Sequence, residues 1–395
     1  MLWIILGILL FLFLVLIHEL GHFIAAKRTG VQVLEFGMGI PPKVLTLWTD
    51  KSGTEYTLNA IPLGGFVRLK WEDPSDSGTF KAKDSFIMAS FRAKTVILFA
   101  GVTVNFLFAW FVFTMLFWRW VSPLMIVPEN ASTSTINSYL TPTYQFLINK
   151  GYISEEDINY IPINVELDSL GSKMGLLSGD IITHINNTFV SPNNLKKSLQ
   201  DSLGKEISLI VLRWNKSLTL NGKCPEDNCV LGVSRNNPKI FYKFPLLQAS
   251  RIALEELYNQ WVVTLSKLGS LWASFFSWSA TTVKSELSGL SGPVGAVKFG
   301  DVLVERGMWA QFLAFGAMIS FALAVFNLLP IPALDGGRWL WVVIQSVFFP
   351  KKIEKYFTIE SYINFVFFVL LMGLGIYIIL KDLVTAWGVN IPFIG

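Results

Sequence analysis

Four long apolar stretches with almost no charge are the feature that most restricts how this chain can fold. Leu2–Ile17, Gly307–Leu334 and Ser361–Leu380 contain no charged residue, and Ala93–Trp118 contains only Lys94. Runs of about 20 apolar residues match the thickness of a bilayer's hydrocarbon core. Charged residues make up only 15% of the 395-residue chain, against about 25% in typical soluble domains. The sequence therefore predicts a multi-pass α-helical membrane protein with about four transmembrane helices.

The distribution of basic residues predicts the orientation. The first stretch reads as a retained span and not a cleaved signal peptide, because no basic segment precedes it and no small-residue cleavage site follows it. Basic residues follow the first stretch (Lys27, Arg28), precede the second (Arg92) and lie between the third and fourth. Because basic loops favour the cytoplasmic side, we expect both termini and the segment between spans two and three to be extracytoplasmic. The net charge of +4 gives no case for nucleic-acid binding.

The first apolar stretch ends in a metal-binding motif, "IHELGHF". His18 and His22 are four residues apart, so on a helix they share one face and can hold one Zn²⁺. Glu19 lies beside the first histidine and can accept a proton from the attacking water. Ionisable groups in a membrane segment cost roughly 2.5–3.5 kcal/mol each on insertion scales. A catalytic metal site explains their presence better than ordinary polar residues at a helix end.

A third metal ligand is expected from a distant part of the chain. The sequence has only two cysteines, both outside the predicted spans, and no further histidine follows at a zincin or metzincin spacing. The remaining candidate is Asp335, the one carboxylate in an otherwise apolar setting, "NLLPIPALDGGR". Pro330 and Pro332 should break the third helix there, and freed backbone groups at membrane depth are tolerated only against protein or water. The stretch should therefore line a cavity, at the same depth as the histidines.

The segment between spans two and three reads as a small α+β domain. The turn and strand "GDIITHIN" is followed by a helical stretch opened by Ser191 and Pro192, and then by the strand "KEISLIVLRW". Together these resemble a bacterial PDZ domain, a fold that captures extended peptides by strand addition. The alternative that this is a small α+β domain that binds no peptide remains open. Cys224 and Cys229 lie here, and they can form a disulfide if this domain is in an oxidising compartment. His184 is expected to be a solvated strand residue.

A further aromatic-rich stretch, 245–286, is interrupted by Lys267. Trp261, Leu265, Leu268, Trp272 and Phe275 recur at spacings of three and four, which predicts an amphipathic helix on the outer membrane surface. A fifth span is the alternative, and it would break the orientation given above.

An N-terminal HExxH span, a PDZ-like insert and a late "LDGG" together resemble the site-2 protease family of intramembrane zinc metalloproteases, and within it the RseP-type regulators of sigma-E. The likeness extends over nearly the whole chain and includes "SGPVG" at 291–295. It implies that the stretch after span one forms a membrane-associated β-hairpin loop that holds substrate as a strand. The alternation in "TEYTLNAIPLGGFVRLK" supports strands independently, with a bend at Gly64 and Gly65.

The resemblance also implies functions for single residues. Asn327 matches the family's asparagine eight residues before the aspartate, which faces substrate, and Asn105 matches an asparagine of span two. We therefore expect Asn327, Gly64, Gly65 and Asn105 to bind substrate. The chain departs from the family twice: Val102 replaces a proline in the span-two motif, and one PDZ-like segment is found where the best-known Gram-negative members have two in tandem.

The predicted function is an endopeptidase of the bacterial inner membrane that holds one Zn²⁺ per chain. Its substrates would be membrane helices of single-pass proteins, such as anti-sigma factors after a first extracytoplasmic cut, and its environment is the lipid bilayer. Two alternatives remain open: a membrane scaffold that captures peptides with its PDZ-like domain, and a membrane-bound zinc peptidase with a soluble-facing site. The expected organisation is a membrane core (1–122), a linker (123–159), an extracytoplasmic PDZ domain (160–240), an amphipathic surface helix region (241–290) and a second membrane core (291–395).

Overall fold

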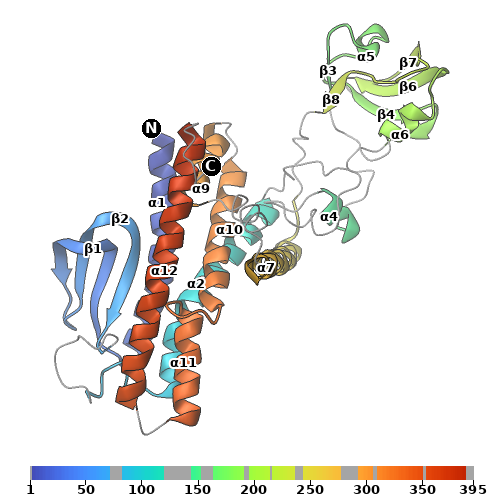
Figure 1. Ribbon diagram of the computed structural model, residues 1–395. Coiled ribbons are helices and arrows are strands. Elements are labelled where there is room, and N and C mark those ends of the chain that lie inside the picture. Colours follow the sequence, from blue (N-terminus) through green and yellow to red (C-terminus); the bar gives the residue numbers. More distant parts are fainter. Residues whose placement is uncertain are drawn as a thin grey trace. The chain divides into compact units, whose positions relative to one another are not determined.

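The computed structural model (Figure 1) describes residues 2–71, 82–119, 144–152, 163–190, 195–213, 216–235, 243–276, 292–305, 309–349 and 353–387. The chain forms two compact units, which are described separately. The first combines residues 1–115 with 264–395, and the second comprises residues 116–263. Ser191, Pro192 and most of the expected linker lie outside the described residues.

Among the described residues, four helices are long and apolar enough to cross a membrane, as the sequence predicts. The spanning segments are Ile5–Thr29, Phe91–Arg119, Trp309–Leu328 and Tyr356–Val384. They belong to α1 (Leu2–Thr29), α2 (Phe91–Arg119), α10 (Trp309–Leu328) and α12 (Ile353–Trp387). The most apolar window of α12 has no buried residue, so its phenylalanines and leucines face outward, where a bilayer would cover them.

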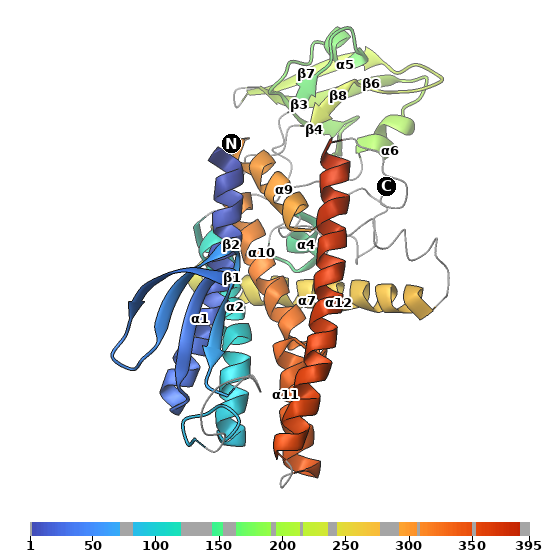
Figure 2. The same ribbon diagram turned by 60° about the vertical axis from the view of Figure 1, so that its left-hand side comes forward.

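The first spanning helix continues beyond its apolar run. Helix α1 extends to Thr29, so His18 and His22 lie on this helix as predicted. Helix α10 stops at Leu328, and a new helix, α11, begins at Asp335 and ends at Phe348. The predicted break at Pro330 and Pro332 is therefore present, and it separates two helices of the first unit (Figure 2).

Strands β1 (Val33–Thr49) and β2 (Glu55–Leu69) form the membrane-core sheet beside α1 (Figure 2). Each strand bends back on itself, so that Gly37 pairs with Phe66 on one side and with Thr57 on the other. The bend in β2 lies at Gly64, where φ is +89°. Among the described residues, the segment 65–69 pairs only with β1. It therefore forms one edge of the sheet, and residues 65–67 of this edge have backbone groups available to a further strand.

A charged cluster ties this sheet to the end of α1. The ammonium of Lys27 donates to Asp50 Oδ2 at 2.9 Å and to Thr54 Oγ1 at 2.8 Å, and it also contacts Ser52 Oγ. Hydrogen bonds from Ser52, together with the contact to Lys27, hold the pKa of Asp50 well below its usual range. The turn between β1 and β2 is thus anchored one helical turn after His22.

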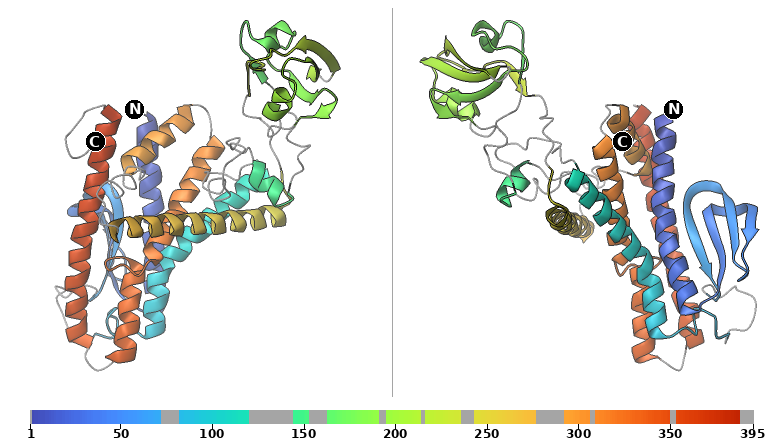
Figure 3. Two further views of the ribbon diagram at one scale, coloured as in Figure 1. Left: turned by 45° about the vertical axis from the view of Figure 1, so that its right-hand side comes forward. Right: turned by 180° about the vertical axis from the view of Figure 1, so that it is seen from behind.

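A short helix and a long one complete the first unit. Helix α9 (Pro293–Glu305) begins within the "SGPVG" motif. The carboxylate of Asp382 in α12 accepts hydrogen bonds from the backbone of Gly292 and Gly295, both at 2.9 Å. A carboxylate in this position satisfies backbone donors at the start of the helix. Helix α1 packs against α10, and the longest helix among the described residues, α12, packs against α9 and runs beside α1 (Figure 3).

The second unit contains a four-stranded antiparallel sheet in the order β5-β4-β6-β7. Its strands are β4 (Ile181–Ile185), β5 (Thr188–Phe189), β6 (Glu206–Arg213) and β7 (Lys216–Lys223). Alternate residues of β6, namely Ile207, Leu209 and Val211, are buried, which is the period expected of a strand with one covered face. A second pair, β3 (Ile163–Val165) with β8 (Val233–Arg235), and the short helices α5 (Leu170–Lys173) and α6 (Leu195–Gln200) complete the domain.

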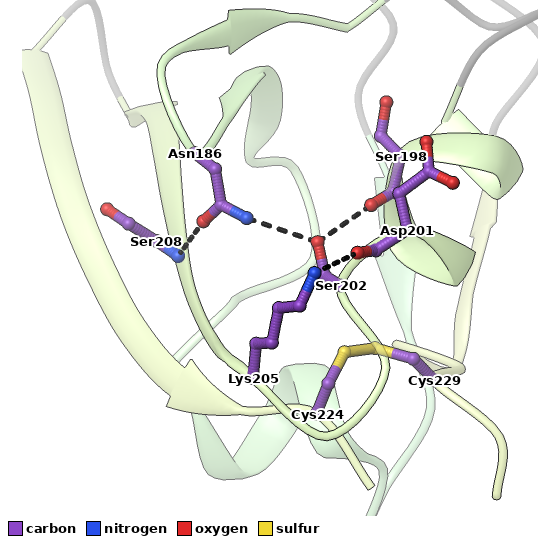
Figure 4. Close-up of a disulfide and its surroundings, with 8 residues drawn as sticks. All are labelled: Asn186, Ser198, Asp201, Ser202, Lys205, Ser208, Cys224 and Cys229. Carbon is purple, nitrogen blue, oxygen red and sulfur yellow. Dashed lines mark hydrogen bonds between the residues drawn. A yellow bond between two sulfur atoms is a disulfide. The ribbon is translucent and has the colours of Figure 1, made fainter. Parts of the chain in front are cut away.

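Polar contacts fix the loops of this domain. A disulfide joins Cys224 to Cys229 (Figure 4). Near it, the side chain of Asn186 accepts from the backbone of Ser208 at 2.9 Å and donates to Ser202 Oγ at 3.1 Å (Figure 4). His184 is half-buried in β4, next to Phe189.

Helices α4 (Tyr144–Asn149) and α7 (Leu246–Phe276) flank this domain in the chain. Helix α7 confirms the helix predicted for this stretch, and it is not among the candidate spans. Leu247, Leu254, Tyr258 and Leu265 are exposed. They recur at intervals of seven, four and seven residues, so they lie on one face of the helix. The opposite face is buried and includes Ala249, Ile252 and Ala253.

Candidate metal centre

Three side chains from distant parts of the first unit converge on one point. His18 and His22 project from successive turns of α1, and Asp335 is the first residue of α11. The Nε2 atoms of the two histidines are 3.2 Å apart. Oδ2 of Asp335 is 3.2 Å from Nε2 of His18 and 3.3 Å from Nε2 of His22. Among the described residues, this is the group of His, Cys, Asp and Glu side chains placed to hold a metal ion.

The dimensions of this triangle fit a zinc ion. Zinc bonds to histidine nitrogen and carboxylate oxygen are about 2.0–2.2 Å long, and a tetrahedral arrangement then separates neighbouring ligand atoms by about 3.3–3.4 Å. The measured separations of 3.2, 3.2 and 3.3 Å agree with that value. Two neutral histidines and one carboxylate also form a donor set that zinc prefers, with the fourth position left for water or substrate.

The break between α10 and α11 places the carboxylate. Gly336 and Gly337 pack so closely on the carbonyls of Leu328 and Ile331 that any larger side chain would clash. Ala333 has a positive φ of +72°. Its backbone N–H donates to Oδ1 of Asn364 in α12 at 3.1 Å. The glycines and Asn364 therefore hold the loop in the shape that points Asp335 at the histidines.

Glu19 faces a cavity of about 310 Å³ at the metal-ligand group. The cavity is lined by His18, Glu19, His22 and Asp335 together with apolar residues of α2 and α10. Glu19 is half-buried. A carboxylate in such a cavity, one residue from a ligand, can exchange protons with a water molecule bound beside it.

The predicted substrate residues lie in two kinds of place. Asn327 lines the same cavity, and Gly65 packs beside Glu19 on the edge segment of β2. Gly64 provides the adjacent bend. Asn105 does not line the cavity; it is fully buried, with its amide 3.3 Å from Nδ1 of His18. Its position is behind the histidine, away from the space open to substrate.

Several residues of the site were not identified from the sequence. The carbonyl of Ile97 accepts a hydrogen bond from Nδ1 of His22 at 2.8 Å. Gly101 lies against both imidazoles, and Gly21 lies against the backbone of Ala100. The spacing of Gly101 and Asn105, one helical turn apart, was the available signal. A backbone carbonyl such as that of Ile97 leaves no mark in the sequence.

Comparison with known proteins agrees with this geometry. The family description "Peptidase family M50" matches residues 6–374. The chain belongs to peptidase family M50. It is thus a site-2 protease relative, a zinc metalloprotease with membrane-spanning helices.

Individual relatives give the same result. A Helicobacter pylori protein described as "Putative zinc metalloprotease" is 30% identical over 390 residues, covering 94% of this chain and 97% of that protein. A Nostoc protein with a description of the same kind is 26% identical over 382 residues, covering 93% and 92%. The Escherichia coli "Regulator of sigma-E protease RseP" is 26% identical over 444 residues, covering 92% and 95%.

Proposed function

We propose that this M50 protease is an intramembrane endopeptidase whose zinc is held by His18, His22 and Asp335. The observation that supports the proposal is the origin of the three ligands. Two come from the interior of one spanning helix, and the third follows directly on the end of another. A site assembled in this way belongs to the membrane core and not to a soluble domain, which disfavours a soluble-facing peptidase.

When bound, zinc supplies Lewis-acid chemistry for hydrolysis of the peptide bond. Glu19 is the general base in this proposal. Its carboxylate accepts one proton from the attacking water and later returns that proton to the leaving amine, so the residue ends the cycle unprotonated. Asn327 lines the same cavity and can donate to a substrate carbonyl through its amide.

The substrate is proposed to bind as an added strand. The edge segment 65–69 runs past the cavity, and Phe66 and Val67 line it. These two residues also line an adjoining cavity of about 670 Å³, which reaches Phe365 and Phe368 of α12. A helical substrate hides its peptide groups in internal hydrogen bonds, so it must unwind before cleavage. An apolar groove with an open strand edge can receive the unwound segment.

The substrate class is proposed to be single-pass membrane proteins, including anti-sigma factors cut first outside the membrane. The name of the Escherichia coli relative mentions regulation of sigma-E, which agrees with anti-sigma factors as one kind of substrate. We further propose that residues 160–240 are one extracytoplasmic PDZ domain that limits access of uncut substrates, and that 241–290 rests on the outer membrane surface. The disulfide and the exposed apolar face of α7 support this arrangement.

The sidedness can be tested with single cysteines after Cys224 and Cys229 are replaced by serine. Ser217→Cys in β7 should react with an impermeant thiol reagent applied to intact cells. Ser90→Cys, just before α2, should react only after the membrane is opened. Both positions are exposed, so the reverse pattern would contradict the proposed orientation.

Glu19→Gln tests the catalytic proposal itself. The variant keeps the shape of the side chain but cannot accept a proton, so it should hold zinc as the parent does and cleave a model membrane-helix substrate about 10²–10⁴-fold more slowly. Glu206→Gln at an exposed position of β6 is the matched control and should cleave at the parent rate. Near-parent cleavage by Glu19→Gln would reject the mechanism.

A further inference from the structure

Both histidines of the metal centre are held from behind by the same helix. Each directs Nε2 towards Asp335, and each turns Nδ1 towards α2. Nδ1 of His22 meets the carbonyl of Ile97 at 2.8 Å. Nδ1 of His18 meets the side-chain amide of Asn105 at 3.3 Å. Helix α2, which provides no metal ligand, therefore contacts the imidazole rings of both His18 and His22.

These contacts lie on one face of α2. Ile97, Gly101 and Asn105 follow one another at intervals of four residues, which places them in a row along the helix. Gly101 lies between the two contact points, and a Cβ there would overlap the imidazoles of His18 and His22. The missing side chain allows α2 to approach closely enough for Ile97 and Asn105 to reach the rings.

The protonation of His18 as a metal ligand determines which kind of hydrogen bond Asn105 must make with it. A neutral imidazole carries one N–H and one lone pair, so a histidine that binds metal through Nε2 must carry its proton on Nδ1. That proton needs an acceptor. The Oδ1 atom of Asn105 is buried and has no hydrogen-bond partner among the described residues. The two ends of an amide have nearly the same shape, and their assignment follows from hydrogen bonding, so Oδ1 belongs opposite Nδ1 of His18.

Asn105 is also fixed in place. It is fully buried, and its backbone carbonyl accepts from Ser320 Oγ in α10 at 3.1 Å. The asparagine therefore links α10, α2 and the first ligand of α1, and it lies away from the cavity that substrate would enter.

We propose that Asn105 is a positioning residue of the metal centre. It accepts the Nδ1 proton of His18, keeps that ring in the tautomer with a free Nε2 lone pair, and directs the lone pair at the metal. This inference rests on the proposed function, because it takes His18 as a zinc ligand. It replaces the expectation that Asn105 contacts substrate.

The test compares Asn105→Leu and Asn105→Asp in the full-length protein. Leucine has a similar volume but no acceptor, whereas aspartate keeps an acceptor oxygen at the same distance from the backbone. Zinc affinity, measured by competition with a chelator, should fall about 10–100-fold in the leucine variant, the usual effect of removing a hydrogen-bond partner of a metal-bound histidine. The aspartate variant should bind zinc at least as tightly as the parent. Thr103→Val, an exposed change on α2, is the control and should leave zinc affinity unchanged.

The other possible outcomes reject the proposal. If Asn105 only fills space, the order of zinc affinities should be reversed. Asn105→Leu should then bind zinc as the parent does, and Asn105→Asp should bind it more weakly because it buries a charge. A substrate contact predicts unchanged zinc affinity in both variants and a raised KM. If circular dichroism shows that the leucine variant does not fold, the aspartate variant still decides, since weaker zinc binding by a folded Asn105→Asp protein contradicts the proposal. His18→Ala is measured alongside: if it retains zinc, the ligand assignment fails first, and that result is distinct from a failure of Asn105.

Discussion

Asp180 of the second unit is buried and Asp335 of the first unit is half-buried, and the two carboxylates have different kinds of partner. Asp180 of the second unit is 1% exposed. It receives two hydrogen bonds from Arg213, at 2.7 and 2.8 Å, and one from the backbone of Leu177 at 2.9 Å. In the first unit, Oδ2 of Asp335 lies 3.2 Å from Nε2 of His18 and 3.3 Å from Nε2 of His22. Arginine brings both charge and a fixed set of donors to Asp180, whereas a histidine that binds metal through Nε2 presents a lone pair there.

This difference separates a structural carboxylate from a functional one. Burial of a charge is costly unless it is paired or bound to a metal. Asp180 is paired within its own domain, and that pair ties β4 to β6. In the proposed metal centre, Asp335 and the two histidines would form a ligand set that a zinc ion completes. We therefore expect the second unit to lose stability when the Asp180–Arg213 pair is broken. We expect the first unit to lose its metal when Asp335 is neutralised.

The largest structural effect is expected for Arg213→Met. It leaves Asp180 buried without its cation and should destabilise the second unit by about 2 kcal/mol, less than a fully enclosed pair because Arg213 reaches solvent. Hydrogen exchange of the β4 and β6 amides in the full chain should accelerate by about 30-fold. Zinc affinity should not change. Equal exchange rates in parent and variant would show that the pair is not structural.

The pH dependence of that effect follows from the titration of Asp180. Burial would raise the pKa of this carboxyl, but the hydrogen bonds from Arg213 and from the Leu177 backbone, together with the charge of Arg213, outweigh burial and lower the pKa. A carboxyl with a lowered pKa contributes stability above its ordinary value, about pH 4, and loses that contribution as pH falls further. The difference between parent and variant should therefore be constant near neutral pH and narrow towards pH 3.

A smaller effect is expected at the loop that carries Asp335. Asn364→Leu removes the acceptor for the Ala333 N–H, and one hydrogen bond contributes about 0.5–1.5 kcal/mol. Zinc affinity should fall by about two- to tenfold, as measured by chelator competition. Tyr362→Phe, an exposed change on the same helix, is the control. Unchanged affinity in Asn364→Leu would mean that the glycines alone hold the loop.

Much of the fold could be predicted because its causes are local. The four spans follow from runs of apolar residues. Alternation predicts β2, whereas β1 was expected only from the family resemblance. The interruption after α10 follows from Pro330 and Pro332. The apolar run does not show where α1 ends, because the helix continues through the polar and charged residues from His18 to Arg28.

The residues of the site could be predicted only where their side chains have a recognisable metal-binding or catalytic chemistry. His18, Glu19 and His22 form a recognisable motif, and Asp335 was identified because the other metal-binding residue types were absent from the apolar segments. The contact between Asn105 and His18 was missed, since a position within a span does not say which neighbour it faces. The carbonyl of Ile97 and the pairing of Asp180 with Arg213, 33 residues apart in sequence, depend on tertiary packing.

The most direct measurement is the zinc content of the purified protein with each aspartate neutralised in turn. The parent should hold about one zinc per chain. Asp180→Asn should keep that zinc, whatever it loses in stability. Asp335→Asn should lose most of it under a chelator concentration that leaves the parent loaded, because a direct ligand contributes at least as much as the 10–100-fold of its hydrogen-bond partners. If Asp335→Asn retains zinc as tightly as the parent, Asp335 is not a ligand and the proposed metal centre is wrong.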